Sequence, residues 1–535
     1  MPSDFMRIVS PELVIGIAGP IGVDIDALSE SIDTAFSEVG YITHLIKITD
    51  EIKDITSSVE APKSESFSEQ MTYKMDHASA LCREQDDPSL LMRYAVKALQ
   101  RERANSPAPK LPLLDIKPIT ATGVNELISR YNEAKDSEKS YEVRYKAAYV
   151  IRQIKRPEEV ELLRTIYGRQ FILVSAYGTE QDRRDRLTKK IKDSLPVSTK
   201  KVEIMHQVED LLMRDMHEGS DKFGQHMRDS YHLADVFVDG ISKAEMDKGL
   251  KRFVRAFFGA ADVGPTKAEF GLYMASAAAL RSSDMSRQIG AAALSDNGEI
   301  LSQGCNEVPK AFGGTYWDTE EPDHRDVKIG YDPNDRKKSE VLRDLLERFA
   351  EKGLLSAKAL GLGGDVSNLA DVLTSKEVDD TGKGALKGSS ILDLTEFGRV
   401  VHAEMNAILE AGRLGTSLVG STLYTTTFPC HNCTKHVISA GIKKVVYLEP
   451  YPKSMARELH EHELSIEEEV TGKVSFFPFQ GIAPAMFRYV FARRKRKKNG
   501  EALRWVDQDN GPTPMVNVML PSYILFEGAA VQKLN

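Results

Sequence analysis

Two short clusters of metal-binding side chains constrain this chain more than any other feature. His402–Glu404 supplies a histidine and a glutamate, and after a gap of 24 residues Pro429–Cys433 supplies two cysteines. Imidazole and thiolate groups are typical zinc ligands. Three protein ligands leave one tetrahedral position open for water, whereas a structural zinc is closed by four. We therefore predict a Zn²⁺ site formed by His402, Cys430 and Cys433.

Glu404 lies two residues after the histidine and is not needed as a ligand. Zinc lowers the pKa of bound water to about 7, but a proton still has to be carried during a hydrolytic reaction. The pattern H-x-E followed by P-C-x-x-C is the signature of zinc-dependent base deaminases, in which the glutamate moves protons to the departing ammonia. Glu404 is therefore the predicted catalytic general acid and base.

A structural zinc is the alternative interpretation of these residues. A lone C-x-x-C pair occurs in many zinc ribbons, and His431 or His436 would complete a Cys2His2 set. That interpretation leaves the positions of Glu404 and Pro429 unexplained, so the catalytic pattern is favoured.

The residues around the motif predict the elements that carry it. Apolar residues at helical spacing indicate a helix over 400–414, with His402 in its first turn. Residues 421–427 predict a strand that leads Cys430 to the start of a second helix over 432–440. The N–H groups at that helix start favour the thiolate form of cysteine.

Length and composition indicate a multidomain globular protein. The 535 residues allow two to four domains, given a prior of about 150 residues each. No apolar run approaches the roughly 20 residues of a membrane span, so no membrane partner is expected. The first residues lack a charged region followed by a long apolar segment, which predicts a cytoplasmic location. Cys82 and Cys305 are expected to be reduced thiols.

A net charge of −8 argues against a general nucleic-acid coat. One unbroken basic run, 493–498, lies near the C-terminus. Such a run is usually a solvated helix end or loop, and a phosphate or RNA contact is the alternative.

The N-terminal segment has the order of a phosphate-binding loop. A buried strand is predicted over 13–18, and a glycine turn then leads into a helix over 25–39. The lysine that a P-loop needs after its last glycine is missing, because Val23 and Asp24 follow Gly22. We expect weak nucleotide binding without phosphoryl transfer, or a tight turn that only packs helix on sheet. The candidate nucleotide-binding residues are Gly16, Gly19 and Gly22.

The remaining pattern predicts three regions. An α/β domain covers 1–195, a charged helical connector covers 196–264, and a second α/β domain covers 265–535. Within the last, a strand hairpin around an Asn-Gly turn and the motif helices predict an α/β/α sandwich. A long insertion over 313–395, rich in charge and glycine, is expected to form a partly mobile flap near the pocket.

The C-terminal half resembles the deoxycytidylate deaminase family. The resemblance rests on Arg281–Asp284, Arg287–Ala291, Gly304–Pro309 and the zinc motif. It implies a cytidine-deaminase-like sandwich with a mixed sheet, in which Asn306 contacts the sugar of a deoxycytidine nucleotide. The family usually has tyrosine where this chain has Cys305. Charge and position predict phosphate contacts from Arg281, Arg287 or Lys310, and ordinary surface or helix-end salt bridges are the alternative for each.

The whole chain resembles a narrower group of bacterial anti-phage proteins, which fuse a P-loop kinase-like domain to such a deaminase. The supporting stretches are 15–26, 151–160, 224–225, 234–238, 314–317 and 477–482. The resemblance implies zinc-dependent deamination of dCTP and dCMP to uracil nucleotides, which depletes deoxycytidine nucleotides during infection. It also implies a homo-oligomer and a nucleotide or regulatory RNA as a further partner.

Two other functions fit parts of the pattern. One is a deaminase of single-stranded DNA or RNA that uses the basic run 493–498 as its strand groove. An aromatic content of 7% and the negative net charge weigh against it. The other is a non-enzymatic regulator that responds to nucleotide or RNA and holds a structural zinc.

Overall fold

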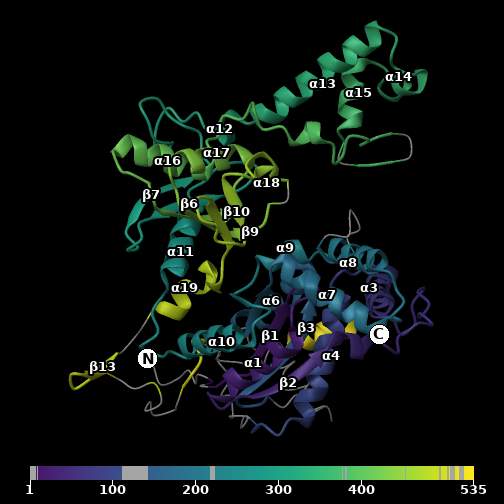
Figure 1. Ribbon diagram of the computed structural model, residues 1–535, viewed down its shortest axis with the longest axis vertical. Helices are drawn as coiled ribbons and strands as arrows, with labels where there is room; N and C mark the ends of the chain where they lie inside the picture. The colour runs from purple at the N-terminus through teal and green to yellow at the C-terminus, as the bar shows by residue number, and fades with distance from the viewer. Residues whose placement is uncertain are drawn as a thin grey trace, which may run out of the picture. The chain divides into compact units, whose positions relative to one another are not determined.

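The computed structural model divides the chain into two compact units (Figure 1). Unit 1 comprises Met1–Tyr273 and Phe479–Asn535, and unit 2 comprises Met274–Pro478. The structure describes residues 8, 10–110, 143–216, 223–375, 377–379, 382–451, 453–492, 496–502, 505, 512–516 and 523–534.

Unit 1 is built on a six-stranded sheet with the order β12-β5-β4-β1-β3-β2, in which only the β12 pairing is antiparallel. Its strands are β1 (Leu13–Ala18), β2 (Ile42–Lys47), β3 (Ala147–Ile154), β4 (Phe171–Tyr177), β5 (Val236–Asp239) and β12 (Gly481–Ile482). All six residues of β1 are buried, as expected for a central parallel strand covered on both faces. The predicted strand over 13–18 is therefore confirmed. The kinase-like character of this unit stays a prediction.

Helices follow the strands of unit 1 in α/β order. They are α1 (Ile25–Ser37), α2 (Ile48–Ile52), α3 (Phe67–Glu84), α4 (Leu90–Asn105), α6 (Pro157–Tyr167), α7 (Glu180–Ser194), α8 (Lys201–Met216), α9 (Met227–Tyr231) and α10 (Lys243–Phe257). α1 begins after Asp24, whose side chain accepts a hydrogen bond from the N–H of Ala27. This cap ends the glycine turn and starts the helix.

The predicted helical connector over 196–264 is not a separate region. Its short apolar stretch forms β5, which pairs in parallel with β4, and its last helix, α10, packs on α1. A strand of four residues is too short for an alternating apolar pattern to be recognised in the sequence, so only the sheet pairing identifies it.

The C-terminal segment also departs from the predicted division, because residues 479–535 belong to unit 1. Within this segment β12 pairs with β5, and α19 (Pro484–Phe491) packs against α10. The helix α20 (Tyr523–Gln532) packs against α4 and α6, and Figure 1 shows the C-terminus beside α4. Apolar periodicity shows that a segment is buried but not which core buries it.

A buried ionic cluster fastens α20 to unit 1. Arg103 donates to both carboxylate oxygens of Glu527, at 2.6 and 2.7 Å, and to Glu12 at 3.0 Å. The hydroxyl of Tyr523 donates to Glu12 at 2.9 Å. Exposure of the three charged side chains is 3% or less. Burial raises the pKa of the Glu12 carboxyl, and the Arg103 guanidinium opposes that shift.

Unit 2 contains a second six-stranded sheet with the order β10-β11-β9-β8-β6-β7. Its strands are β6 (Gly290–Leu294), β7 (Ile300–Cys305), β8 (Thr422–Thr427), β9 (Lys444–Glu449), β10 (Leu464–Ile466) and β11 (Val474–Pro478). The pairs β6–β7 and β6–β8 are antiparallel, and the other pairs are parallel. The predicted hairpin and mixed sheet are confirmed.

Two glycines show that helices cover both faces of this sheet. Gly290 pairs with Cys305, whereas Gly304 pairs with Ala291, so the two glycines face opposite sides. A Cβ at Gly290 would lie 2.0 Å from a carbonyl oxygen of α11 (Lys267–Ala279). A Cβ at Gly304 would lie 2.3 Å from a carbonyl oxygen of α16 (Ala403–Leu414). The sheet is therefore sandwiched between α11 and α16.

The insertion over 313–395 has its own helices and a small apolar core. The helices are α12 (Asp326–Ile329), α13 (Pro333–Glu351), α14 (Ala357–Gly363) and α15 (Val366–Leu373). Leu342 and Leu346 of α13 pack with Leu369 and Ala370 of α15, and Figure 1 shows α13, α14 and α15 gathered together. Its role as a mobile flap stays a prediction.

No helix among the described residues is both long and apolar enough to cross a membrane. In the basic run 493–498, residues 493–495 lie outside the described ranges. Lys497–Lys498 forms the short strand β13, which pairs with β14 (Glu501–Ala502) in unit 1.

We expect Glu527→Ala to destabilise unit 1 by about 3 kcal/mol, because it leaves the buried Arg103 with one carboxylate instead of two. Calorimetric unfolding of the full chain measures the effect. Lys533→Ala, an exposed change beyond the same helix, is the control and should leave the transition unchanged. Equal melting temperatures for Glu527→Ala and the wild type would contradict the integration of α20 into unit 1.

Candidate metal centre and active site

The three predicted ligands meet where two helices begin. His402 is the residue immediately before α16, and Cys430 immediately precedes α17 (His431–Ser439). The Nδ1 atom of His402 lies 3.4 Å from the Sγ atoms of both Cys430 and Cys433. All three ligand atoms lie within 4.8 Å of one another. One imidazole and two thiol groups at such separations fit the borderline-soft preference of Zn²⁺.

Asn306, the residue after β7, contacts the first turn of α16. Its Oδ1 accepts the N–H of Ala403 at 2.9 Å, and the His402 side chain makes no capping hydrogen bond. The imidazole lies toward the two cysteines instead. The Nδ2 of Asn306 donates to Asp284 at 3.1 Å and to the carbonyl of Arg287 at 3.3 Å. Asn306 thus ties the loop over 284–287 to the start of the ligand helix.

The start of α17 also favours a thiolate. Cys430 accepts the N–H of Cys433 at 3.4 Å. Hydrogen bonding from Cys433 and His402 lowers the pKa of Cys430 to about 4, although burial opposes the shift. A thiolate is the form that ligates a metal.

Neither His431 nor His436 joins the ligand cluster. Among the described histidine, cysteine and carboxylate residues, only His402, Cys430 and Cys433 bring their ligand atoms together at this place. This geometry therefore supplies no fourth ligand for a closed Cys2His2 site. Three ligands leave room for a reacting water.

Glu404 lies in the first turn of α16 and is 4% exposed. It lines the same pocket as His402 and Cys430. Burial raises the pKa of its carboxyl above the ordinary value. A buried carboxyl beside the ligand cluster is placed to accept a proton and to return it.

The pocket has a volume of about 730 Å³, within the range of small-molecule sites. Phe428 and Tyr451 contribute aromatic surface to its wall. Residues at both ends of the insertion also line it, among them Asp326 and Thr395. Both ends of the insertion therefore contribute to the wall of the candidate site.

The predicted phosphate contacts divide into one that lines the pocket and two that do not. Arg287 lines it and forms an ion pair with Glu449 at 3.2 Å. Arg281 hydrogen-bonds Thr315, and its guanidinium carbon lies 3.9 Å from the ring centre of Trp317. Lys310 forms an ion pair with Glu320. Arg281 and Lys310 are absent from the pocket lining, so the structure does not support them as substrate contacts there.

Two basic residues that the motif analysis did not select do line the pocket. Arg399 pairs with Asp326 at 2.8 Å, and Lys453 pairs with Asp393 at 2.7 Å. Arg399 lies only three residues before His402, so closeness to the motif was a usable signal. No local pattern marks Lys453, which follows β9 in a loop.

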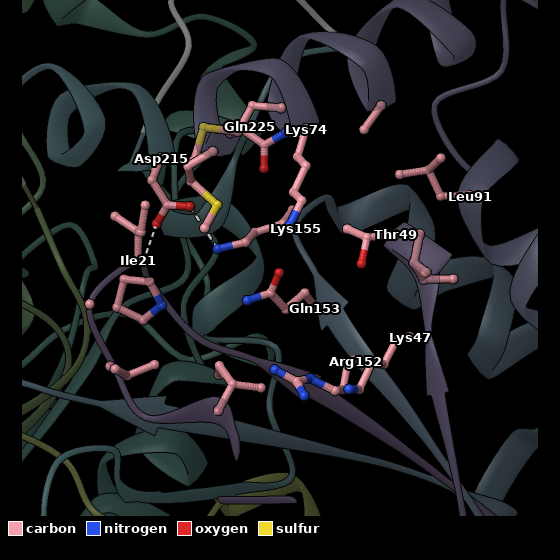
Figure 2. Close-up of a pocket in the computed structure, with 18 of the residues that line it drawn as sticks. Ile21, Lys47, Thr49, Lys74, Leu91, Arg152, Gln153, Lys155, Asp215 and Gln225 are labelled. Atoms are coloured by element: carbon pink, nitrogen blue, oxygen red, sulfur yellow. Dashed lines mark hydrogen bonds and ion pairs between the residues drawn. The ribbon is translucent and has the colours of Figure 1, made fainter. Parts of the chain in front are cut away.

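The three glycines predicted to bind nucleotide have different surroundings. Gly16 lies within β1, where a Cβ would meet Ile154 at 2.4 Å. Gly19 offers its carbonyl to the Nζ of Lys155 at 2.8 Å. Gly22 has φ +99° and lines a pocket in unit 1, which Figure 2 shows. Gly16 is thus a packing position, and Gly22 is the only one of the three in that pocket.

Comparison with known proteins agrees with the chemistry of unit 2. Residues 265–449 match the family model described as "Cytidine and deoxycytidylate deaminase zinc-binding region". Deoxycytidylate deaminase of Enterobacteria phage T2 is 52% identical over 54 residues, which are 10% of this chain and 29% of that protein. ComE operon protein 2 of Bacillus subtilis (strain 168) is 47% identical over 64 residues, or 12% and 34%.

These matches are local. The chain spans 28% to 34% of the length of the first curated relatives that it matches. A solved dCMP deaminase from the cyanophage S-TIM5 is 17% identical and covers 40% of this chain and 99% of that one. Its TM-score of 0.21 is too low to support a conclusion.

We expect purified protein to contain one zinc ion per chain, and we expect His402→Ala or Cys430→Ala to abolish this content. Each change removes one of three ligands, and no described side chain is placed to replace it. Elemental analysis by mass spectrometry provides the measurement.

His436→Ala, on the ligand helix α17, is the matched control and should keep its zinc. Loss of zinc in His431→Ala or His436→Ala would instead identify a closed four-ligand site.

Proposed function

We propose that unit 2 hydrolytically deaminates the cytosine base of deoxycytidine nucleotides, with dCTP and dCMP as substrates. The observation that carries the proposal is the His402, Cys430 and Cys433 cluster beside the buried carboxyl of Glu404 in one pocket. A structural zinc site needs no such carboxyl, whereas hydrolysis of an amino group needs a proton carrier.

The proposed reaction exchanges the amino group of the base for the oxygen of water. A zinc ion held by His402, Cys430 and Cys433 would lower the pKa of a water molecule and so supply the nucleophile. Glu404 would accept the first proton of this water and pass it to the ring nitrogen, and it would then carry the second proton, from the newly bound hydroxyl, to the departing amino group. One water is consumed, and the products are one ammonia and a uracil nucleotide. The raised pKa of Glu404 suits both transfers.

The pocket also suits a small nucleotide. Its volume of about 730 Å³ and its aromatic wall can enclose a base and sugar. Arg287, Arg399 and Lys453 line it, and each is paired with a carboxylate that a substrate phosphate would have to displace. The contact of Asn306 with the sugar stays a prediction, because its amide already bonds three protein groups.

We extend the proposal to a biological role: depletion of deoxycytidine nucleotides during phage infection, by a homo-oligomer that responds to nucleotide or RNA. The support is the resemblance of both parts of the chain to bacterial anti-phage deaminases. The relatives named as deoxycytidylate deaminases match over only 54 to 66 residues, so they support the reaction and not the role.

A substrate panel tests the reaction. The protein is incubated separately with deoxycytidine, dCMP, dCTP, CTP and single-stranded DNA, and ammonia and uracil products are measured before and after zinc chelation. We expect release of ammonia from dCMP and dCTP that chelation abolishes and added zinc restores. Turnover of only the DNA would favour a polynucleotide deaminase instead.

Glu404→Gln should lower kcat by about a thousandfold or more, because an amide cannot carry the proton. Its zinc content and melting temperature should match those of the wild type, since the residue is not a ligand. Glu410→Gln, on the same helix but outside the pocket lining, is the control and should keep full activity. Near-normal turnover by Glu404→Gln would contradict the mechanism.

A further inference from the structure

Glu307 carries a buried carboxyl group that the proposed mechanism does not use. It is the second residue after β7 and is 1% exposed. Its Oε2 accepts both the N–H of Ser283 at 2.9 Å and the Ser283 hydroxyl at 2.8 Å. Its Oε1 accepts the N–H of Val308 at 2.9 Å. A carboxyl group is costly to bury, and these three donors satisfy its oxygens.

The backbone of Glu307 is paired with the segment that leads to the predicted zinc ligand. The N–H of Val401 donates to the carbonyl of Glu307 at 3.0 Å, and the N–H of Glu307 donates to the carbonyl of Val401 at 3.3 Å. Val401 immediately precedes His402. Glu307 therefore connects the ligand segment, through its backbone, with Ser283, through its side chain.

Ser283 begins a loop that forms part of the pocket wall. The next four residues, 284–287, all line the pocket. Asn306 donates from its Nδ2 to Asp284 at 3.1 Å and to the carbonyl of Arg287 at 3.3 Å. The consecutive residues Asn306 and Glu307 thus hold this loop at its first, second and last positions. These contacts fix the backbone from which the Arg287 side chain extends.

Arg287 is the basic side chain of this loop. Its guanidinium carbon lies 5.8 Å from the ring centre of Tyr451, which also lines the pocket. It pairs with Glu449 at 3.2 Å, and its side chain is 52% exposed, so a ligand in the pocket can reach it. A guanidinium can donate two parallel hydrogen bonds to a phosphate, but only at the correct distance and orientation. The position of the loop backbone therefore decides whether Arg287 can make them.

We propose that Glu307 is a positioning residue for nucleotide binding: it holds Ser283 so that Arg287 meets a phosphate of the substrate. The inference rests on the proposed function of unit 2, because it requires a nucleotide in this pocket. Glu307 lies outside the pocket lining and acts only through the loop. Loosening the loop weakens binding of the substrate and of the transition state equally, so KM rises whereas kcat is kept.

Glu307→Gln keeps the size of the side chain but replaces one acceptor oxygen with an amino group. We expect it to raise KM for dCMP about tenfold, with kcat and zinc content unchanged. Ser283→Ala removes only the hydroxyl partner and should raise KM about threefold, and Ser283→Thr should restore it. Glu299→Gln is the matched control, because Glu299 is an exposed carboxylate before β7 that accepts a hydrogen bond from Ser295. It should behave as the wild type does.

A double-mutant cycle separates positioning from a merely structural role. Arg287→Ala should also raise KM for dCMP, and adding Glu307→Gln to it should have no further effect, because Glu307 acts through Arg287. Effects of the two changes that multiply would overturn the inference. So would a KM equal to that of the wild type in both Glu307→Gln and Ser283→Ala. The two Ser283 variants and Arg287→Ala carry the test if Glu307→Gln does not fold.

Binding of dCMP to the same variants in a Glu404→Gln background, measured by titration calorimetry, gives the comparison without turnover. Ammonia release from dCMP by the wild type, with equal Kd values for Glu307→Gln and Glu299→Gln, would overturn only the positioning role. Weaker dCMP binding by Glu307→Gln, with no ammonia released by the wild type, would support the positioning role and overturn the proposed reaction. Absence of dCMP binding and of ammonia release would overturn both.

Discussion

The hydrogen bond between Asn306 and the first N–H of α16 is the contact that positions the candidate site. Asn306 follows β7 and also bonds Asp284 and the carbonyl of Arg287, so it fixes the start of α16 against the loop that lines the pocket. The adjacent His402 turns its ring toward Cys430 and Cys433. The same helix turn then carries Glu404 into the buried pocket floor. The predicted ligand and the predicted proton carrier are thus placed by one backbone element.

In both pockets, basic side chains are paired with carboxylates of the same unit. In unit 2, Arg287, Arg399 and Lys453 are each balanced by a carboxylate near the pocket. In unit 1, Asp215 balances Lys155 directly on the glycine turn. The Lys155–Asp215 pair is buried, so each partner prevents the other from being an uncompensated buried charge. The three pairs of unit 2 involve partly exposed basic side chains, so they contribute less.

The path of the chain explains why the two units form one protein. After β11 ends unit 2, the chain returns to unit 1, adds β12 to its sheet edge and ends in α20. Buried Arg103 pairs with Glu12, near the start of the sequence, and with Glu527, near its end. These pairs hold the returning segment in unit 1. Three charges in a buried space specify one docking geometry, since any misplacement leaves an uncompensated charge. Unit 2 is therefore inserted within unit 1, not appended to it.

By itself, the sequence determined the local elements of unit 2 and predicted the residues that would carry its chemistry. The zinc motif, the Asn-Gly hairpin and the buried strand over 13–18 can be recognised from short residue patterns, without knowledge of the fold. Only the tertiary structure decided that Arg281 stacks on Trp317 instead of lining the pocket, and that Lys453 does line it. Only the tertiary structure likewise shows that Asp215 accepts the N–H of Ile21 in the glycine turn, although the two residues are 194 positions apart in the sequence. Charge marks a residue as able to bind an anion, but which partner it meets depends on contacts between segments distant in the chain.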